Sequence, residues 1–345
     1  MDETNPQPPA PAPLDPHQLS PRRVKRRLMV SLVVLHALSL FAAAVLVLRA
    51  KDPAPKGEKK ALLSSLAANK ETVGWVTIRG PIMAGETGRP WERGAEQWAR
   101  RIEQLAETKG VKAIVLDINS PGGSVGAVQE IHSRILRVKK EKNIPFVALF
   151  GDVSASGGYY LGAACDKIVA HPGTLTGSIG VIFSVTNLEG LFTKIGFKQD
   201  PIKSGKHKDI GSPARPMTAE ERQLLQAMID DTYGQFVGAV AEGRKMSVEE
   251  VKPLADGRIY TGTQALQLKL VDQLGDSKDA LMLAAKLGGI KDEKPKVRRD
   301  VERMSDLFEL LETKARLTLG LGALESPLAR LQGPGPGLHY LWTGW

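Results

Sequence analysis

Residues 151–160 read Gly-Asp-Val-Ser-Ala-Ser-Gly-Gly-Tyr-Tyr and join an apolar run to a stretch of small residues. The run before them, Ile-Pro-Phe-Val-Ala-Leu-Phe at 144–150, has the composition of a buried strand, whereas 158–165 is typical of a short helix. Two glycines directly after Ser156 permit a tight turn that a side chain would block. Such a turn can expose a serine hydroxyl and aim peptide N–H groups at the atom that the serine attacks. The stretch therefore indicates either a nucleophile at Ser156 or an ordinary glycine-rich turn.

Strand and helix patterns alternate on both sides of this turn. Short glycine-rich connections between alternating elements are typical of an α/β fold with a largely parallel sheet. The sequence Thr-Ala-Glu-Glu at 218–221 is a capping box, which marks the start of a long helix. We expect strands at 73–79, 113–118, 144–150 and 167–170, and helices at 93–109, from about 125 to 136 and from 218 to about 244.

The chain divides into five segments by composition. Residues 1–27 are a proline-rich tail that ends in a basic cluster, and residues 28–48 carry no charge. A helix of 21 residues is about 31 Å long, which is enough to cross a bilayer core. We expect an uncleaved signal anchor with a cytoplasmic N-terminus, and a cleaved signal peptide is the alternative. A tether at 49–70 leads to a folded domain at 71–288, and residues 289–345 are expected to form a charged linker, an amphipathic helix and an aromatic tail.

Charge and cysteine content exclude several classes of function. The net charge is +9, but residues 1–60 carry +5 of it, and the remaining +4 is ordinary for a soluble domain. No basic recognition helix supports binding to nucleic acid. Cys165 is the single cysteine, so an intramolecular disulfide is impossible. No set of His, Cys, Asp and Glu residues has metal-ligand spacing, and we expect neither a metal nor another cofactor.

A nucleophilic serine needs a general base, because a free serine hydroxyl is unreactive at neutral pH. His171 and His207 are the histidines in core loops, and His171 reads as structural. Lysine can serve when burial lowers its pKa, and the loop at 203–209 holds three lysines. The turn Pro-Gly-Gly at 121–123, together with the N–H of Gly157, could supply the oxyanion donors.

Five ordered motifs resemble the signal peptide peptidase A family of Ser/Lys membrane peptidases. The resemblance covers roughly residues 72–288 and implies a ClpP/crotonase fold of repeated β-β-α units behind an N-terminal transmembrane helix. The motifs are Asn-Ser-Pro-Gly-Gly-Ser at 119–124, Ser-Ala-Ser-Gly-Gly-Tyr-Tyr at 154–160, Leu-Thr-Gly-Ser-Ile-Gly-Val-Ile at 175–182, Lys-Ser-Gly-Lys-His-Lys-Asp-Ile-Gly-Ser at 203–212 and Ala-Asp-Gly-Arg-Ile-Tyr-Thr-Gly at 255–262.

The resemblance assigns a role to each candidate site residue. The family's nucleophile falls on Ser156, its general-base lysine on Lys208, and the serine that orients the lysine on Ser178. Oxyanion donors would be Gly157 and one of Gly122 and Gly123, with Gly123 slightly favoured.

The resemblance also implies a setting for the reaction. Substrates would be released signal peptides and other extended apolar peptides, cleaved by a ring-like homo-oligomer in which neighbouring subunits contribute to each site. Residues 28–48 would hold the chain in a bacterial inner membrane, with the peptidase domain on the periplasmic side.

Other functions remain open at this point. A related ClpP-fold membrane peptidase would cleave a specific partner such as a stomatin-like protein, and a non-catalytic oligomeric scaffold would use the same ring without chemistry. A crotonase-type acyl-CoA enzyme is weaker, because it would leave the Ser/Lys pair without a purpose. The terminal aromatic residues Tyr340, Trp342 and Trp345 could dock on a neighbouring subunit, touch the membrane interface, occupy the peptide groove or have no role.

Overall fold

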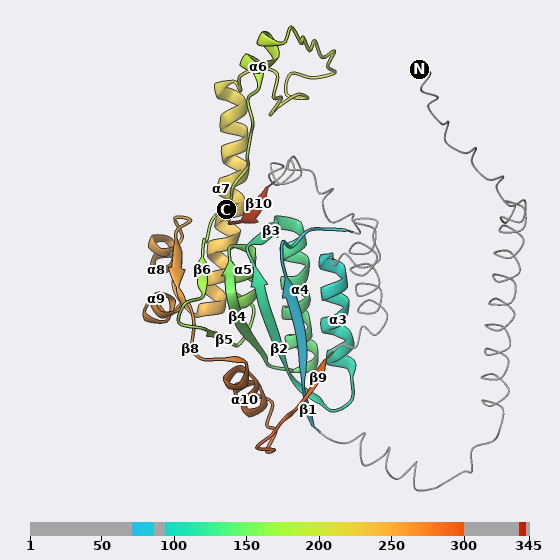
Figure 1. Ribbon diagram of the computed structural model, residues 1–345, viewed down its shortest axis with the longest axis vertical. Coiled ribbons are helices and arrows are strands. Elements are labelled where there is room, and N and C mark those ends of the chain that lie inside the picture. Colours follow the sequence, from blue (N-terminus) through green and yellow to red (C-terminus); the bar gives the residue numbers. More distant parts are fainter. Residues whose placement is uncertain (1–70, 86–93, 300–337, 343–345) are drawn as a thin grey trace, which may run out of the picture. The chain divides into compact units, whose positions relative to one another are not determined.

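The computed structural model describes residues 71–85, 94–299 and 338–342 (Figure 1). Its helices and strands alternate along most of the described chain. The strands are β1 (Thr72–Arg79), β2 (Val111–Ser120), β3 (Gly122–Ser124), β4 (Phe146–Ala155), β5 (Lys167–Ala170), β6 (Leu175–Gly177), β7 (Ile259–Thr261), β8 (Gln273–Leu274), β9 (Lys296–Arg299) and β10 (His339–Leu341). The helices are α3 (Ala95–Glu107), α4 (Val125–Lys142), α5 (Gly157–Ala163), α6 (Glu189–Lys194), α7 (Ala219–Arg244), α8 (Val248–Val251), the 3-10 helix η1 (Lys252–Leu254), α9 (Gly262–Gln267) and α10 (Ser277–Leu287).

A mostly parallel sheet forms the centre of this domain, as the sequence predicted. Its strands run in the order β7-β6-β4-β2-β1-β9, and β5 pairs with both β4 and β8. Side chains alternate between the two faces with the period of two that a strand imposes. Val73 and Trp75 of β1 pack with α10, whereas Val76 and Ile78 pack with the cluster that includes α3 and α4. Figure 1 shows α10 on the opposite side of the sheet from α3 and α4, so the central strands are covered on both faces.

Strand β4 changes partner in its middle, and this change positions Ser156. Residues 147–150 pair with β5, whereas residues 153–155 pair with β6. Where the partner changes, side chains form hydrogen bonds with the backbone groups of β4. The Val153 N–H donates to Asn119 Oδ1 at 3.0 Å, and Thr174 Oγ1 donates to the Gly151 carbonyl at 2.8 Å. Because these buried groups keep partners, β4 continues to Ala155, five residues beyond its predicted end.

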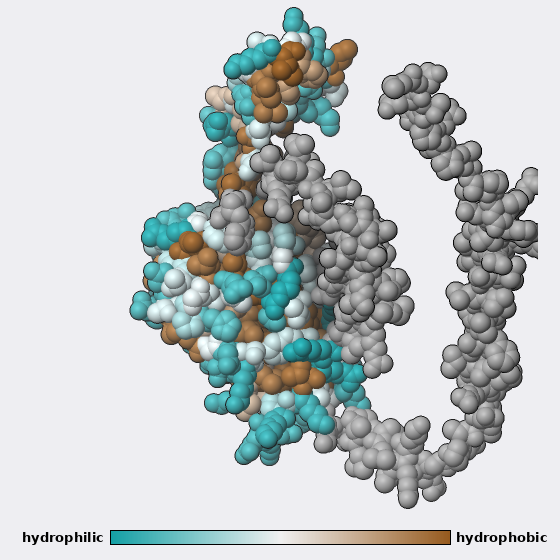
Figure 2. All heavy atoms as spheres, in the orientation of Figure 1, coloured by the Kyte–Doolittle hydropathy of each residue, from teal (hydrophilic) through white to brown (hydrophobic). Residues whose placement is uncertain are grey.

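Helix α7 carries a projecting arm, defined here as residues 183–217. Figure 1 shows α6 and its loops at the far end of α7, beyond the edge of the sheet. The predicted capping box begins α7: Thr218 accepts from the Glu221 N–H, and Glu221 accepts from the Thr218 N–H. Apolar side chains of the arm are exposed, among them Leu191, Ile195 and Phe197, and Figure 2 shows hydrophobic residues gathered at its tip.

Two predictions near the ends of the domain have different outcomes. The predicted boundary at residue 288 is too early, because β9 pairs in parallel with β1 and extends the sheet to Arg299. β9 reads as a linker in the sequence because all four of its residues are exposed and three are basic. The predicted anchor at 28–48 lies outside the described residues. Within the described ranges, no helix is long and apolar enough to cross a membrane.

Two glycines of α7 provide a matched test of the packing between α7 and α5. A Cβ on Gly243 would overlap the carbonyl oxygen of Ala163, whereas a Cβ on Gly238 would meet nothing within 4 Å. We expect Gly243→Ala to lower the free energy of unfolding by about 1–3 kcal/mol through overpacking. Gly238→Ala should raise it by roughly 0.5–1 kcal/mol, since alanine loses less conformational freedom in a helix.

Urea denaturation of both variants measures the two effects. Equal free energies of unfolding for Gly243→Ala and Gly238→Ala would show that the close approach of α7 to α5 is wrong.

Candidate active site

Ser156 occupies the turn between β4 and α5 in a backbone conformation that serine rarely adopts. Its φ is 53° and its ψ is −117°, and the residue is 1% exposed. A non-glycine residue with such dihedrals costs about 1–3 kcal/mol, so it persists only where neighbours enforce it. Ser156 N–H donates to the Gly177 carbonyl at 2.8 Å, and the Tyr160 N–H donates to the Ser156 carbonyl at 2.9 Å. These bonds hold the residue between strand and helix, as the sequence predicted.

Three glycines surround the same turn at distances that exclude side chains. A Cβ on Gly122 would lie 2.6 Å from the Gly157 nitrogen, and a Cβ on Gly157 would lie 3.0 Å from the Gly122 Cα. Gly122 has φ +98°, and its N–H donates to Ser120 Oγ at 3.1 Å. Gly123 follows in β3, where a Cβ would overlap the backbone of Ile82. The predicted oxyanion glycines are therefore brought together with Ser156.

Ser178 lies beside Ser156 because β4 and β6 are parallel neighbours that end together. Ala155 pairs with Gly177, and one further residue along each strand gives the two serines. Ser178 also has a positive φ of 50°, and its N–H donates to the Arg258 carbonyl at 2.7 Å. The structure thus gathers five of the six predicted site residues around one point.

A hollow of about 460 Å³ opens beside Ser156 and Ser178. Sequence reasoning did not single out the part of its wall that α7 supplies. Tyr233 and Asp230 come from α7, and their spacing signals only that they share a helix face. The other lining residues are Gly180, Val181, Ile182, Ile229, Ala255, Asp256, Gly257, Leu341 and Trp342.

Lys208 does not line this hollow. It lies on the arm with an exposed side chain, which has no ion-pair partner among the described residues. The other two lysines of the loop are paired, Lys203 with Asp209 at 2.8 Å and Lys206 with Glu220. Lys208 is therefore the lysine of this loop whose ammonium group is not held by a described carboxylate.

An ion-pair cluster fixes the loop that carries Lys208 to the start of α7. Arg215 bonds both Asp209, at 2.9 Å, and the buried Glu221. Hydrogen bonds from Arg215 and Lys203 hold the pKa of Asp209 well below its usual range. Arg215 and the Thr218 N–H lower the pKa of Glu221 to about 2, so the cluster stays charged across the physiological range.

Neither histidine of the core loops lines the hollow beside Ser156. His171 is exposed after β5, and His207 faces Glu220 at 3.3 Å on the arm. His132 on α4 packs edge-on against Tyr160 with ring centroids 4.7 Å apart. Burial, and secondarily the charge of Lys139, lowers the pKa of His132 to about 4.

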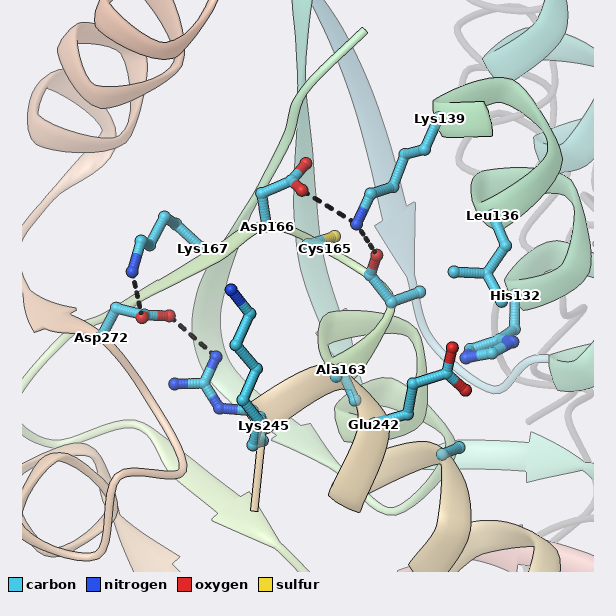
Figure 3. Close-up of a pocket in the computed structure, with 14 residues that line it drawn as sticks. His132, Leu136, Lys139, Ala163, Cys165, Asp166, Lys167, Glu242, Lys245 and Asp272 are labelled. Carbon is cyan, nitrogen blue, oxygen red and sulfur yellow. Dashed lines mark hydrogen bonds and ion pairs between the residues drawn. The ribbon is translucent and has the colours of Figure 1, made fainter. Parts of the chain in front are cut away.

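A second hollow, of about 480 Å³, lies between α4, α5 and α7 (Figure 3). Most of its charges are paired with each other: Lys139 with Asp166 at 3.0 Å, and Asp272 with both Lys167 and Arg244. Cys165 is packed in the core at 2% exposure, and burial raises the pKa of its thiol. Among the described residues, no group of three or more His, Cys, Asp and Glu could hold a metal ion.

Comparison with known proteins agrees with this geometry. The model of peptidase family S49 matches residues 138–291, which contain Ser156, Ser178 and Lys208. A protein of Synechocystis sp. named as a protease is 45% identical over 251 residues, which are 68% of this chain and 90% of that protein. The chain belongs to peptidase family S49. It is a serine peptidase, and the resemblance found in the sequence is confirmed.

Two further S49 relatives are longer than the matched region. A protein of Enterococcus faecium named as signal peptide peptidase SppA is 41% identical over 220 residues, 62% of this chain and 63% of that protein. Protease 4 of Salmonella typhi is 36% identical over 220 residues, 64% of this chain and 35% of that protein. The match therefore spans about a third of the length of protease 4.

The lowered pKa of His132 predicts a pH dependence of stability. In the unfolded chain the His132 side chain takes up its proton near pH 6.5, whereas in the folded chain it does so near pH 4. The free energy of unfolding should therefore fall as the pH drops from 6.5 to about 4, by at most about 3 kcal/mol. Urea denaturation at several pH values measures the slope, and His132→Gln should flatten it. An unchanged slope in His132→Gln would contradict the assignment.

Proposed function

We propose that this peptidase is a membrane-anchored endopeptidase that uses a Ser156/Lys208 dyad. The observation that carries the proposal is the strained Ser156 turn, surrounded by the backbones of Gly122, Gly123 and Gly157. Family membership supports the chemistry, and the geometry supports Ser156 as the nucleophile. Ser178 lines the same hollow as Ser156, and this supports a role in which its hydroxyl accepts a hydrogen bond from the lysine amine and orients it.

The reaction is acyl transfer in two steps. Neutral Lys208 takes the proton of Ser156 Oγ as that oxygen attacks the peptide carbonyl carbon, and backbone N–H groups stabilise the resulting oxyanion. The C–N bond then breaks, and Lys208 returns the proton to the leaving amine. Water attacks the acyl-serine ester with Lys208 again as base, which releases the acid and restores Ser156. Gly123 and Gly157 are the proposed donors, because the Gly122 N–H is bonded to Ser120.

We infer that Lys208 serves the Ser156 of a neighbouring copy of the chain. Lys208 is exposed on the projecting arm and absent from the wall of its own hollow, which supports donation to another subunit. The arm also exposes Leu191, Ile195 and Phe197, which are 51–65% exposed in the single chain. An apolar patch of this kind marks an interaction site, and a closed ring of identical subunits would cover it.

The proposed substrates are signal peptides and other extended apolar peptides at the periplasmic face of a bacterial inner membrane. The relative named as signal peptide peptidase supports this class. The uncharged run at 28–48 supports an anchor that concentrates the enzyme where such peptides are released.

Removal of either dyad residue should abolish proteolysis without unfolding the chain. We expect Ser156→Ala and Lys208→Ala to lower kcat/KM for a model signal peptide by at least about 10³-fold, because the two groups act as a unit. Lys206→Ala is the matched control: it removes an exposed ion pair with Glu220 and should change kcat/KM only a few fold. Proteolysis retained by purified Ser156→Ala would sink the assignment.

Mixing the two inactive variants tests whether the dyad forms between subunits. Copies with Ser156→Ala still offer Lys208, and copies with Lys208→Ala still offer Ser156. Co-assembly should restore up to about a quarter of the wild-type rate if neighbours pair at random, since activity needs an intact serine facing an intact lysine. Mixtures that co-assemble yet stay inactive would place both groups in one chain.

A further inference from the structure

The segment 338–342 near the end of the chain lies between two backbone segments beside Ser156. β10 pairs antiparallel with β3, in the register His339 to Ser124, Tyr340 to Gly123 and Leu341 to Gly122. On its other edge, His339 exchanges two hydrogen bonds with Ile182, at 3.0 and 3.1 Å. The segment thus adds a strand to exposed backbone on both sides, which is how proteins bind extended peptides.

The carbonyl group of Tyr340 points to the glycines around Ser156. A Cβ on Gly122 would overlap the Tyr340 carbonyl oxygen, and a Cβ on Gly157 would lie 3.1 Å from the same oxygen. Flanking bonds run from the Val125 N–H to the Leu338 carbonyl and from the Trp342 N–H to the Pro121 carbonyl. Because bonded pairs alternate in an antiparallel ladder, Tyr340 and Gly123 form a pair of the hydrogen-bonded kind. The Tyr340 carbonyl therefore occupies the position proposed for the oxyanion.

The side chain of Tyr340 fills a closed aromatic pocket. Tyr340 is 0% exposed and stacks on Tyr160 with centroids 5.1 Å apart and rings inclined by 20°. Phe236 covers another side, with its ring centroid 4.7 Å from that of Tyr340. The Tyr340 hydroxyl donates to the Thr232 carbonyl at 3.1 Å, so the polar tip of the ring is satisfied as well.

We propose that residues 338–342 occupy the peptide-binding groove as a substrate does, and that the pocket of Tyr160, Phe236 and the Thr232 carbonyl selects an aromatic side chain before the bond to be cleaved. This inference rests on the proposed function, because it takes the Ser156 turn as the reacting centre. The peptide bond between Tyr340 and Leu341 marks the register: the carbonyl sits among the glycines, and Leu341 and Trp342 line the hollow that contains Ser156.

The geometry also ranks the side chains that the pocket accepts. An alanine would leave the space between Tyr160 and Phe236 empty, whereas phenylalanine would fill it without the bond to Thr232. We therefore expect peptides with tyrosine to bind best, those with phenylalanine within about tenfold, and those with alanine at least about tenfold more weakly than tyrosine.

A binding experiment separates this inference from catalysis. The full-length chain with Ser156→Ala and Tyr340→Ala cannot use its serine, and its own segment no longer fills the pocket. A fluorescently labelled peptide Leu-His-Tyr-Leu-Trp should bind this variant at least about tenfold more tightly than the same peptide with alanine in place of tyrosine. Equal affinity for the two peptides, or binding of neither, would overturn the inference.

A second variant covers the case in which Tyr340→Ala fails to fold. Trp342→Pro removes the N–H that donates to Pro121 and leaves the buried Tyr340 side chain unchanged. Combined with Ser156→Ala, it should bind the tyrosine peptide more tightly than Ser156→Ala alone does. No gain in affinity would count against occupancy of the groove by residues 338–342.

Hydrolysis by the full-length Tyr340→Ala chain, or by Trp342→Pro, then tests the preference in the active enzyme. Peptides identical except for one position should be cleaved after tyrosine or phenylalanine at least about tenfold faster than after alanine. Cleavage without this preference overturns the inference and leaves the proposed function intact. An enzyme that cleaves no peptide, with a Ser156 that a serine-reactive probe does not label, overturns the proposed function, and the binding result still decides the inference.

Discussion

The left-handed backbone of Ser156 is the constraint on which the rest of the site depends. A positive φ is an unfavourable backbone conformation for serine, so contacts with residues distant in the sequence must hold Ser156 in it. The partner change within β4 supplies them, since it brings β6 alongside and lets the Gly177 carbonyl accept from the Ser156 N–H. The same change sets Ser178 beside Ser156. One irregularity in one strand therefore positions both serines and the start of α5.

Local patterns in the sequence predicted the elements that local physics decides. The apolar runs of β1, β2, β4 and β5 are buried on both faces, and composition reveals such strands directly. The capping box of α7 and the glycine turn after Ser156 depend on neighbours within a few residues. Ser156 and the candidate glycines could therefore be named from local patterns before their distances were known, whereas Ser178 was named from the family resemblance.

The features that the sequence did not predict depend on distant partners. β9 is a short, exposed, basic strand, and only its pairing with β1 makes it part of the sheet. β10 lies in a glycine- and proline-rich stretch, and its partner in β3 is more than 200 residues away. The position of Lys208 is a third case: the family resemblance singles it out, but the single chain leaves it on an exposed arm, outside the hollow that Ser156 lines.

The covalent connection between β10 and the domain has a consequence for how the groove can be emptied. A free peptide leaves when the solution is diluted, because its rebinding depends on its concentration. A segment of the same chain keeps a fixed local concentration however dilute the enzyme is. A substrate must therefore compete with residues 338–342 for the groove. It competes better when its concentration near the enzyme is high. Confinement to a membrane surface, where peptides move in two dimensions, is one physical way to reach such abundance.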